Sequence, residues 1–120
     1  DQVELYYKAA DVSVLPYRYI FQSGVIFVSY VFGLPVIATD VGSLRETIVE
    51  GSTGFLCRPG DPQDLAATIA GYFQSDLYRN LKRSRKAIAR LARHTYSWEA
   101  IGRQTLGVYE KLRGAGGGAA

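Results

Sequence analysis

The sequence predicts an α/β fold: half of a doubly wound parallel sheet, with three strands and flanking helices. Short apolar segments bounded by turn residues alternate with longer segments in which apolar residues recur at helical spacing. This alternation is typical of parallel βαβ units, and two consecutive right-handed crossovers make half of such a sheet. Because buried parallel strands normally have neighbours on every side, we expect the chain to be part of a larger domain.

Three short segments are expected to form the strands. Val12–Leu15 is a β-branched run closed by Pro16, Pro35–Thr39 is a second apolar run, and Gly54–Cys57 is the third. Short runs that are mostly apolar and bounded by turn residues are typical of strands buried on both faces.

The remaining segments favour helices. The chain starts with apolar residues at helical spacing, and Ser23 is expected to cap a helix that continues through Phe32. Ser43 and Glu46 have the spacing of a capping box, which predicts a short helix ending at Gly51. Three more helices are expected: one that starts at Asp61 and Pro62, a basic one over 75–92, and a last one capped by Ser97.

Composition excludes several classes of protein. With 48% hydrophobic and 21% charged residues among 120, the chain is neither disordered nor collagen-like. One cysteine, Cys57, and one histidine, His94, offer no internal disulfide and no Cys- or His-rich metal site, and they disfavour a Ser-His-Asp centre. No apolar run approaches the ~20 residues of a membrane span and no leader opens the chain, so we expect a cytoplasmic protein.

The junction between the first strand and the following helix has the clearest chemical pattern. In open α/β sheets, ligands bind outside the carboxyl ends of the strands. The backbone N–H groups of Ser23, Gly24 and Val25 would point outward at a helix start, where the helix dipole favours a phosphate or another anion. Gly24 would also let a ligand approach the backbone closely. A plain helix cap beside a close-packing glycine explains these residues equally well.

Several short motifs follow one another along nearly the whole chain. They are Ala10–Pro16, Gln22–Val25, Gly33–Thr39, Gly42–Glu46, Gly51–Leu56, Pro59–Pro62, Tyr96–Glu99 and Tyr109–Leu112. In this order and spacing they resemble the group 1 nucleotide-sugar glycosyltransferases. No single motif carries the resemblance, since the spacing between motifs also agrees.

The resemblance implies two Rossmann-like domains, of which the carboxyl-terminal one binds the nucleotide-sugar donor. Residues 1–113 would be the later part of that Rossmann-like donor-binding domain. Residues 114–120 consist of Gly and Ala alone, and this composition predicts a flexible Gly/Ala tail. The resemblance also implies a retaining transfer of a sugar from a nucleotide diphosphate sugar to an acceptor, with no metal and no other cofactor. The alternative is a non-catalytic nucleotide- or phosphate-binding module, or a dimerising one.

The same resemblance indicates which residues would meet the donor. Gln22–Val25 would face its phosphate and sugar. Glu46 lies where the family has a glutamate after a glycine-rich turn, although its place in a capping box explains it as well. Arg18 is the only cation of its loop and could partly replace a family Arg/Lys pair that binds the diphosphate; a solvated loop residue is the simpler interpretation.

One departure from the family concerns catalysis. The family often has two glutamates with seven positions between them, which here fall at Ile20 and Val28 or, shifted by one, at Phe21 and Ser29. No Asp or Glu occurs anywhere from residue 12 to residue 39, so no carboxylate for charge stabilisation can come from this loop. We therefore assign no catalytic residue and expect this chain alone to be inactive.

Seven of the fourteen Lys and Arg residues lie between Arg79 and Arg93. The simplest interpretation is a solvated helix face. The second is attraction to an anionic membrane surface, the inner membrane, because the resemblance implies that lipid-linked acceptors are common. Nucleic-acid binding is the least favoured, since the nearby aromatic residues Tyr72, Phe73 and Trp98 fall at core positions.

The strand Val12–Leu15 also predicts an assembly. In a doubly wound sheet it would pair with a strand that precedes this chain, so here it is an edge. An apolar edge invites pairing with another chain. We expect a homodimer that joins two Val12–Leu15 edges across a two-fold axis, making a six-stranded sheet that is antiparallel only at its centre.

Overall fold

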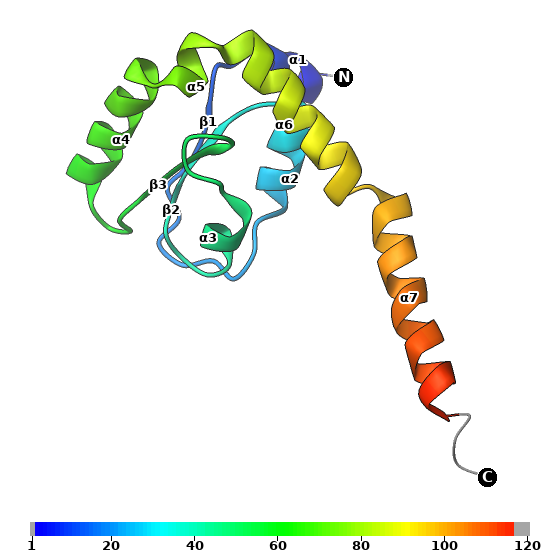
Figure 1. Ribbon diagram of the computed structural model, residues 1–120. Helices are drawn as coiled ribbons and strands as arrows, with labels where there is room; N and C mark the ends of the chain where they lie inside the picture. The colour runs from blue at the N-terminus through cyan, green and yellow to red at the C-terminus, as the bar shows by residue number, and fades with distance from the viewer. Residues whose placement is uncertain (1, 117–120) are drawn as a thin grey trace.

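Three parallel strands in the order β1-β2-β3 form the sheet of this protein (Figure 1). The structure is a computed structural model that describes residues 2–116. The strands are β1 (Ser13–Leu15), β2 (Val36–Thr39) and β3 (Gly54–Cys57). In register, Val14 lies opposite Ile37, and Ile37 lies opposite Phe55. The predicted α/β half-sheet of three parallel strands with flanking helices is therefore confirmed.

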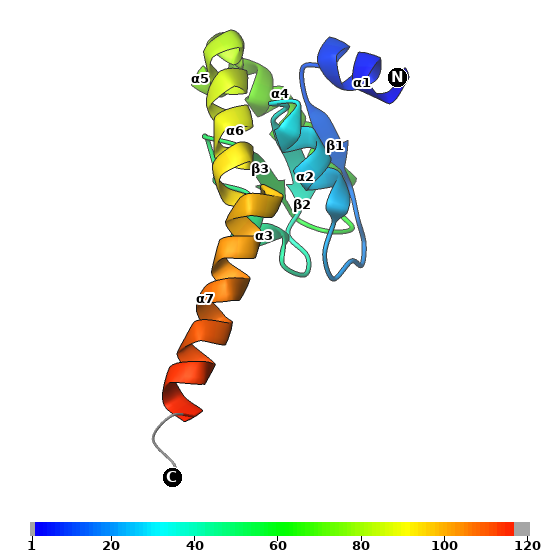
Figure 2. The same cartoon turned by 90° about the vertical axis from the view of Figure 1, so that its right-hand side faces the viewer.

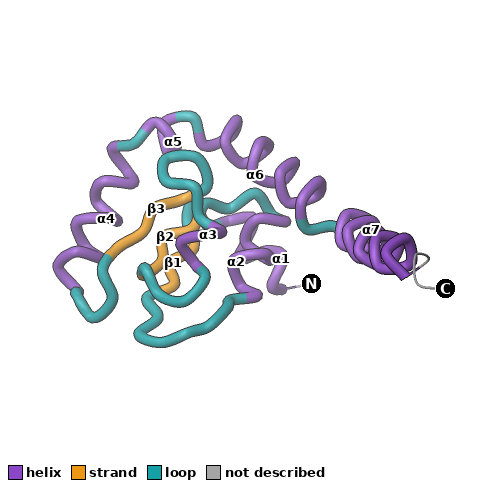
Figure 3. Tube along the Cα trace, turned by 60° about the horizontal axis from the view of Figure 1, so that its bottom comes forward, coloured by secondary structure: helices purple, strands orange, loops and turns teal. Residues whose placement is uncertain are grey.

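The described range contains seven helices, of which all but the last lie around the sheet (Figures 1 and 3). They are α1 (Gln2–Ala9), α2 (Gly24–Val31), α3 (Leu44–Thr47), α4 (Pro62–Gln74), α5 (Asp76–Arg79), α6 (Leu81–Thr95) and α7 (Trp98–Gly116). Helices α2 and α6 pack on each other on one side of the sheet, while α4 lies on the other side against β3 and β2.

The central strand β2 explains this two-sided arrangement. All four of its residues are buried, because successive side chains of a strand point to opposite faces and both faces are covered. Val36 and Ala38 join a core with the apolar residues of α2, α3 and α6. Ile37 points the other way and packs with Tyr72 of α4 and Leu77 of α5.

Two glycines let neighbouring backbones come unusually close. A Cβ atom on Gly54 in β3 would overlap the carbonyl oxygen of Val36 in β2. Gly33, which follows α2 with a φ of +69°, lies so near α6 that a Cβ would overlap the carbonyl oxygen of Arg85. A side chain at either position would push apart elements that form the core.

The predicted basic helix over 75–92 is wrong as a single element. Asn80 interrupts it, with φ −109° and ψ 33°, and separates α5 from α6. The side-chain amide of Asn80 donates to the carbonyl oxygen of Asp76 at 3.2 Å. This local bond gives the backbone an alternative to a continuous helix, which is why asparagine favours helix ends.

The predicted helix after Ser43 is shorter than expected. It ends at Thr47, because Ile48 is extended and buries its side chain in the core. The capping box is also wrong. Ser43 gives both its N–H and its Oγ–H to the carbonyl oxygen of Phe21, at 3.1 and 3.0 Å. Its hydroxyl therefore fixes the preceding loop instead of capping the helix, and Glu46 stays exposed.

Helix α7 projects away from the rest of the molecule (Figure 2). Ser97 caps it as predicted, accepting from the N–H of Ala100 at 3.1 Å. The prediction that Trp98 lies in a core is wrong, since its side chain is 86% exposed. Phe73 also falls short of a core position, being exposed on α4. The helix continues to Gly116, past the predicted start of the tail at Gly114, and residues 117–120 lie outside the described range.

Candidate functional site

The loops that leave the three strands meet at the carboxyl edge of the sheet. Arg18 follows β1, Thr39 ends β2 and Arg58 follows β3, and all three line one hollow of about 160 Å³. The strands are parallel, so their carboxyl ends lie at the same edge. This is the edge at which open α/β sheets bind ligands.

A larger hollow of about 620 Å³ lies along the loop that follows β1. Its lining residues are Arg18, Tyr19, Ile20, Phe21, Val41, Gly42 and Pro59. The aromatic rings of Tyr19 and Phe21 are 93% and 92% exposed. Two large apolar rings that pack against almost nothing in this chain are a feature of binding surfaces.

The loop carrying these rings is held in place. Thr39 donates from Oγ1 to the carbonyl oxygen of Tyr17 at 2.5 Å, and Ser43 binds the carbonyl oxygen of Phe21 as described above. Gly42, with a φ of +55°, packs so tightly that a Cβ would overlap the carbonyl oxygen of Ile20. The rings are therefore exposed on an anchored backbone.

The amino terminus of α2 opens at the end of this loop. Gly24 is the first helical residue and is exposed, and a Cβ built on it would meet no atom within 4 Å. The first N–H groups of a helix have no acceptor within the helix and carry the positive end of its dipole. Gly24 is thus not a close-packing glycine, and the absence of a side chain leaves room for a ligand.

Ser23 differs from the prediction. Its backbone is extended, as a residue before a helix should be, but its side chain makes no capping bond. The hydroxyl lies 3.1 Å from the phenol oxygen of Tyr17, and the residue is buried. The N–H groups of the first turn therefore stay available instead of being satisfied by the serine.

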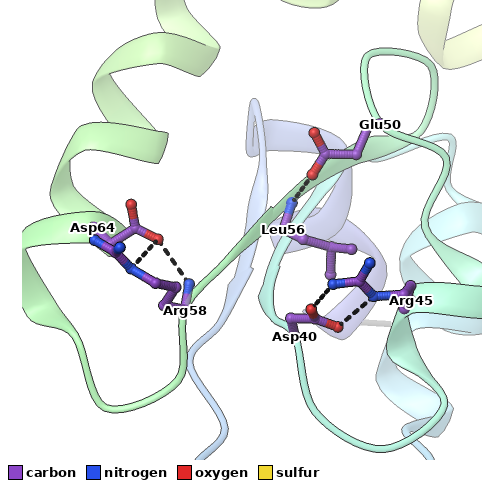
Figure 4. Close-up of polar contacts among 6 residues, drawn as sticks. All are labelled: Asp40, Arg45, Glu50, Leu56, Arg58 and Asp64. Carbon is purple, nitrogen blue, oxygen red and sulfur yellow. Dashed lines mark hydrogen bonds and ion pairs between the residues drawn. The ribbon is translucent and has the colours of Figure 1, made fainter.

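A cluster of charged side chains lies beyond β2 and β3 (Figure 4). Arg45 forms a two-pronged ion pair with Asp40, and Arg58 pairs with Asp61 at 3.1 Å and Asp64 at 3.7 Å. The Arg45 guanidinium lowers the pKa of Asp40 below its usual value, chiefly through their hydrogen bond. All three carboxylates are already engaged in ion pairs with these arginines.

The cluster surrounds a hollow of about 430 Å³ with Cys57 at one wall. The Cys57 side chain is buried, and burial raises the pKa of its thiol, with smaller contributions from Asp64 and Asp61. A protonated, buried thiol is a poor nucleophile. Within residues 2–116, no group of three or more His, Cys, Asp or Glu side chains is arranged to hold a metal ion.

Comparison with known proteins gives the family. A family model described as "Glycosyl transferases group 1" matches residues 1–75. The chain belongs to the group 1 glycosyl transferases. It is 32% identical over 114 residues to D-inositol 3-phosphate glycosyltransferase 2 of Catenulispora acidiphila, covering 92% of this chain and 26% of that protein. It is 31% identical over 100 residues to glycogen synthase of Mycobacterium tuberculosis, covering 83% of this chain and 24% of that protein.

Solved structures agree on the fold. Sucrose-phosphate synthase from Thermosynechococcus elongatus superposes with a TM-score of 0.72 at 32% identity, over 92% of this chain and 27% of that one. The Anabaena protein Alr3699/HepE, solved in complex with UDP, superposes with a TM-score of 0.75 at 21% identity, over 88% and 29%. This group 1 glycosyl transferase chain therefore spans about a quarter of the length of the relatives it matches.

The predicted site residues of this glycosyl transferase lie in three places: the carboxyl edge of the sheet, the start of α2, and α3. Arg18 lines the hollows of the carboxyl edge, and Gln22, Gly24 and Val25 are exposed at the start of α2. Glu46 is exposed on α3 but is absent from the linings of the three hollows described above. Sequence reasoning missed Tyr19, Phe21, Arg58 and the Asp40–Arg45 pair.

A positional signal could have found some of these residues. Asp40 and Arg58 are the residues directly after β2 and β3, and residues in that position gather at the carboxyl edge of a parallel sheet. The exposure of Tyr19 and Phe21 had no such signal, because aromatic residues in an apolar stretch are usually buried.

The positions at which the family often has glutamates are occupied here by residues that pack or form hydrogen bonds within the fold. Ile20 packs partly buried against the core, and Ser29 is fully buried, donating to the carbonyl oxygen of Val25 at 2.9 Å.

Among residues 2–116, no helix is both long and apolar enough to cross a membrane.

Proposed function

We propose that this chain binds the nucleotide diphosphate sugar donor of a glycosyltransferase at the carboxyl edge of its sheet. The whole protein would move the sugar to an acceptor, with retention of configuration as the family resemblance implies. The single observation that carries the proposal is the open start of α2, where Gly24 leaves the first N–H groups uncovered three residues after Phe21, which lines the same hollow as Arg18. The UDP bound to the Anabaena relative supports the choice of ligand class.

The diphosphate would lie against the first turn of α2. Backbone N–H groups and the helix dipole favour a phosphate there, and a glycine at the first position lets oxygen atoms approach the amides. Arg18 adds a cation on the loop and is exposed. A guanidinium is suited to phosphate because its donors match two oxygens at once.

The sugar or the base would fill the hollow beside the exposed rings. Tyr19 and Phe21 present aromatic faces on the anchored loop, and such faces stack on planar bases and on sugar rings. The phosphates at α2 and the rings at the loop then hold the two ends of one extended ligand.

Charge on the leaving diphosphate would be stabilised without a nearby free carboxylate. Donors that are already oriented toward developing negative charge are an effective form of catalysis, and the α2 amides with Arg18 are such donors. The acids at this edge, Asp40, Asp61 and Asp64, are held in ion pairs. The acceptor and any acid or base would come from the rest of the protein.

Titration with UDP, GDP and ADP, followed by backbone amide NMR shifts, tests the binding site. We expect weak binding with shifts centred on Gln22–Val25. A Gly24→Leu substitution should weaken binding about tenfold or more, the scale of one hydrogen bond to a charged group. Gly71→Leu on α4 is the matched control, because a Cβ at Gly71 also meets nothing within 4 Å. Shifts confined to residues 79–93 would mean charge attraction alone and would overturn the proposal.

The second candidate is a nucleotide- or phosphate-binding chain that does not catalyse transfer. It is favoured by one observation, the absence of Asp and Glu from residue 12 to residue 39. Both candidates bind the nucleotide. A transfer assay on the full-length parent separates them, since only the first gives a glycosylated product.

A further inference from the structure

Helix α6 carries a strip of positive charge on its outer side. Its inner side is built from Ile88 and Ala92, which are buried in the core beside α2. The outer side carries five exposed cations, which are Lys82, Arg83, Lys86, Arg90 and Arg93. No acidic residue occurs anywhere in α6.

These five cations are not neutralised by neighbours. Elsewhere in the described chain, Arg45, Arg58 and Arg79 each pair with an aspartate. None of the five on α6 has an ion pair with any residue in the 2–116 range. Two acids lie nearest along the chain: Asp76, six positions before Lys82, and Glu99, six positions after Arg93. Asp76 shares a shallow hollow with Arg83 but is paired to Arg79 at 3.5 Å.

The strip is long and straight. At 100° and 1.5 Å per residue, Lys82, Lys86, Arg90 and Arg93 fall within one side of the helix and span about 17 Å along its axis. Helix α6 packs beside α2 with Ile88 and Ala92 turned toward the core, so the opposite side of the helix faces outward (Figures 1 and 2). Arg83 lines a hollow with Asp76 and Asn80.

A straight strip on the convex side of a helix suits a flat, extended anionic partner. A compact phosphate ligand needs converging donors, and these side chains diverge from a convex helix. Nucleic-acid surfaces commonly add aromatic stacking residues, and the outer side of α6 has no aromatic residue. We infer that the outer side of α6 docks on an anionic lipid bilayer.

Long basic side chains reach the headgroups of such a surface while the helix stays folded on its own core. Each Lys or Arg at the surface of an anionic bilayer strengthens binding about fivefold. Five of them give reversible binding that salt weakens, because the interaction is screened over about 10 Å at 0.1 M salt. This inference does not depend on the proposed donor site, which lies at the carboxyl edge of the sheet.

Vesicle sedimentation tests it with two kinds of membrane. The purified chain should bind vesicles containing about one-third phosphatidylglycerol and should not bind pure phosphatidylcholine vesicles. The triple variant Lys82→Gln, Lys86→Gln, Arg90→Gln should weaken binding about 100-fold. These side chains are exposed, so the thermal midpoint should stay near that of the parent chain.

A charge-matched control separates a docking strip from net charge. The triple variant Arg103→Gln, Lys111→Gln, Arg113→Gln removes three exposed cations from α7 and should bind the anionic vesicles like the parent. An equal loss in both triple variants would overturn the inference, since only net charge would matter. Binding to a DNA duplex that is tighter than binding to the vesicles, and is lost in the α6 variant, would overturn it in favour of a nucleic acid. UDP titration of the α6 variant should give the parent result, so this experiment and the donor-site test fail separately.

Discussion

The guanidinium of Arg85 donates a hydrogen bond to the carbonyl oxygen of Ala10 at 2.6 Å, across 75 positions of sequence. The same side chain donates to the carbonyl oxygens of Tyr7 at 2.9 Å and Phe32 at 3.2 Å. These acceptors lie at the ends of α1 and α2, where the last carbonyl groups of a helix lack partners and a cation is favourable. One residue of the basic run therefore joins three helices, while its five neighbours on α6 face solvent.

Arg85→Ala should destabilise the chain by about 2 kcal/mol, the scale of losing hydrogen bonds to a charged group. It leaves three carbonyl oxygens without this donor and loosens α1 from the rest. The measurement is urea unfolding followed by circular dichroism. Lys86→Ala, one residue along and exposed, is the control and should change stability by no more than about 0.5 kcal/mol. Equal effects from the two substitutions would contradict a bridging role for Arg85.

The strands were predictable because local pattern and tertiary environment agree there. Val36, Ile37 and Ala38 are apolar without alternation, and both faces of β2 are buried. The start of α4 was equally plain: Asp61 accepts from the N–H of Asp64 at 2.9 Å and Pro62 occupies the first turn, as expected from sequence.

Several errors arose where another residue competes for a group that the local pattern assigns elsewhere. Ser43 has the right spacing for a capping box, yet the carbonyl oxygen of Phe21, 22 positions away, takes its hydroxyl. Ser23 likewise turns to Tyr17. Arg85 could not be distinguished from the solvated arginines beside it, since its acceptors belong to helices that sequence spacing does not bring together.

The free energy of unfolding should depend on pH in the alkaline range, because the phenols of Tyr30 and Tyr72 are buried. Burial raises the pKa of Tyr30 to about 12 and that of Tyr72 to about 12, from an ordinary value of 10.0. Because the folded state holds these protons more tightly than the unfolded state, their contribution to stability is complete below pH 10. It is lost as the pH rises from about 10 to about 12.

Absorbance at alkaline pH measures this directly. Of the nine tyrosines, Tyr30 and Tyr72 should ionise only as the pH approaches about 12, together with unfolding. Tyr30→Phe removes one of the two and the hydrogen bond of 2.8 Å to Thr53, so it should lower stability at pH 7 and weaken the pH dependence above 10. Nine phenols that titrate together near pH 10 in a folded chain would contradict the assignment.

The isolated chain should transfer no sugar. It spans about a quarter of the length of its relatives, and the acids that lie at its carboxyl edge are held in ion pairs. Without a positioned acceptor, neither orientation nor acid–base chemistry is complete. An assay with a nucleotide sugar, an acceptor and the purified chain should give no product above the background without protein. Product that disappears in the Gly24→Leu variant would refute this expectation.

The open edge of β1 predicts self-association. Ser13 donates its N–H to the carbonyl oxygen of Pro35 at 2.9 Å. Since the N–H groups of successive strand residues point to alternate sides, the N–H of Val14 faces away from β2. Val14 is also 37% exposed. An edge that is apolar and has free donors pairs readily with a second copy.

We therefore expect a two-fold dimer at micromolar concentration in analytical ultracentrifugation, joined through the two Val12–Leu15 edges. Val14→Pro should convert it to a monomer, because it deletes a donor at the edge and no bond to β2. Ser13→Pro is the contrasting change: it removes the bond to Pro35 inside the sheet and should lower the stability of the monomer itself. Val14→Ala keeps the N–H and should remain dimeric. A parent chain that sediments as a monomer at high concentration, with fast amide exchange at Val14, would show that this edge does not pair.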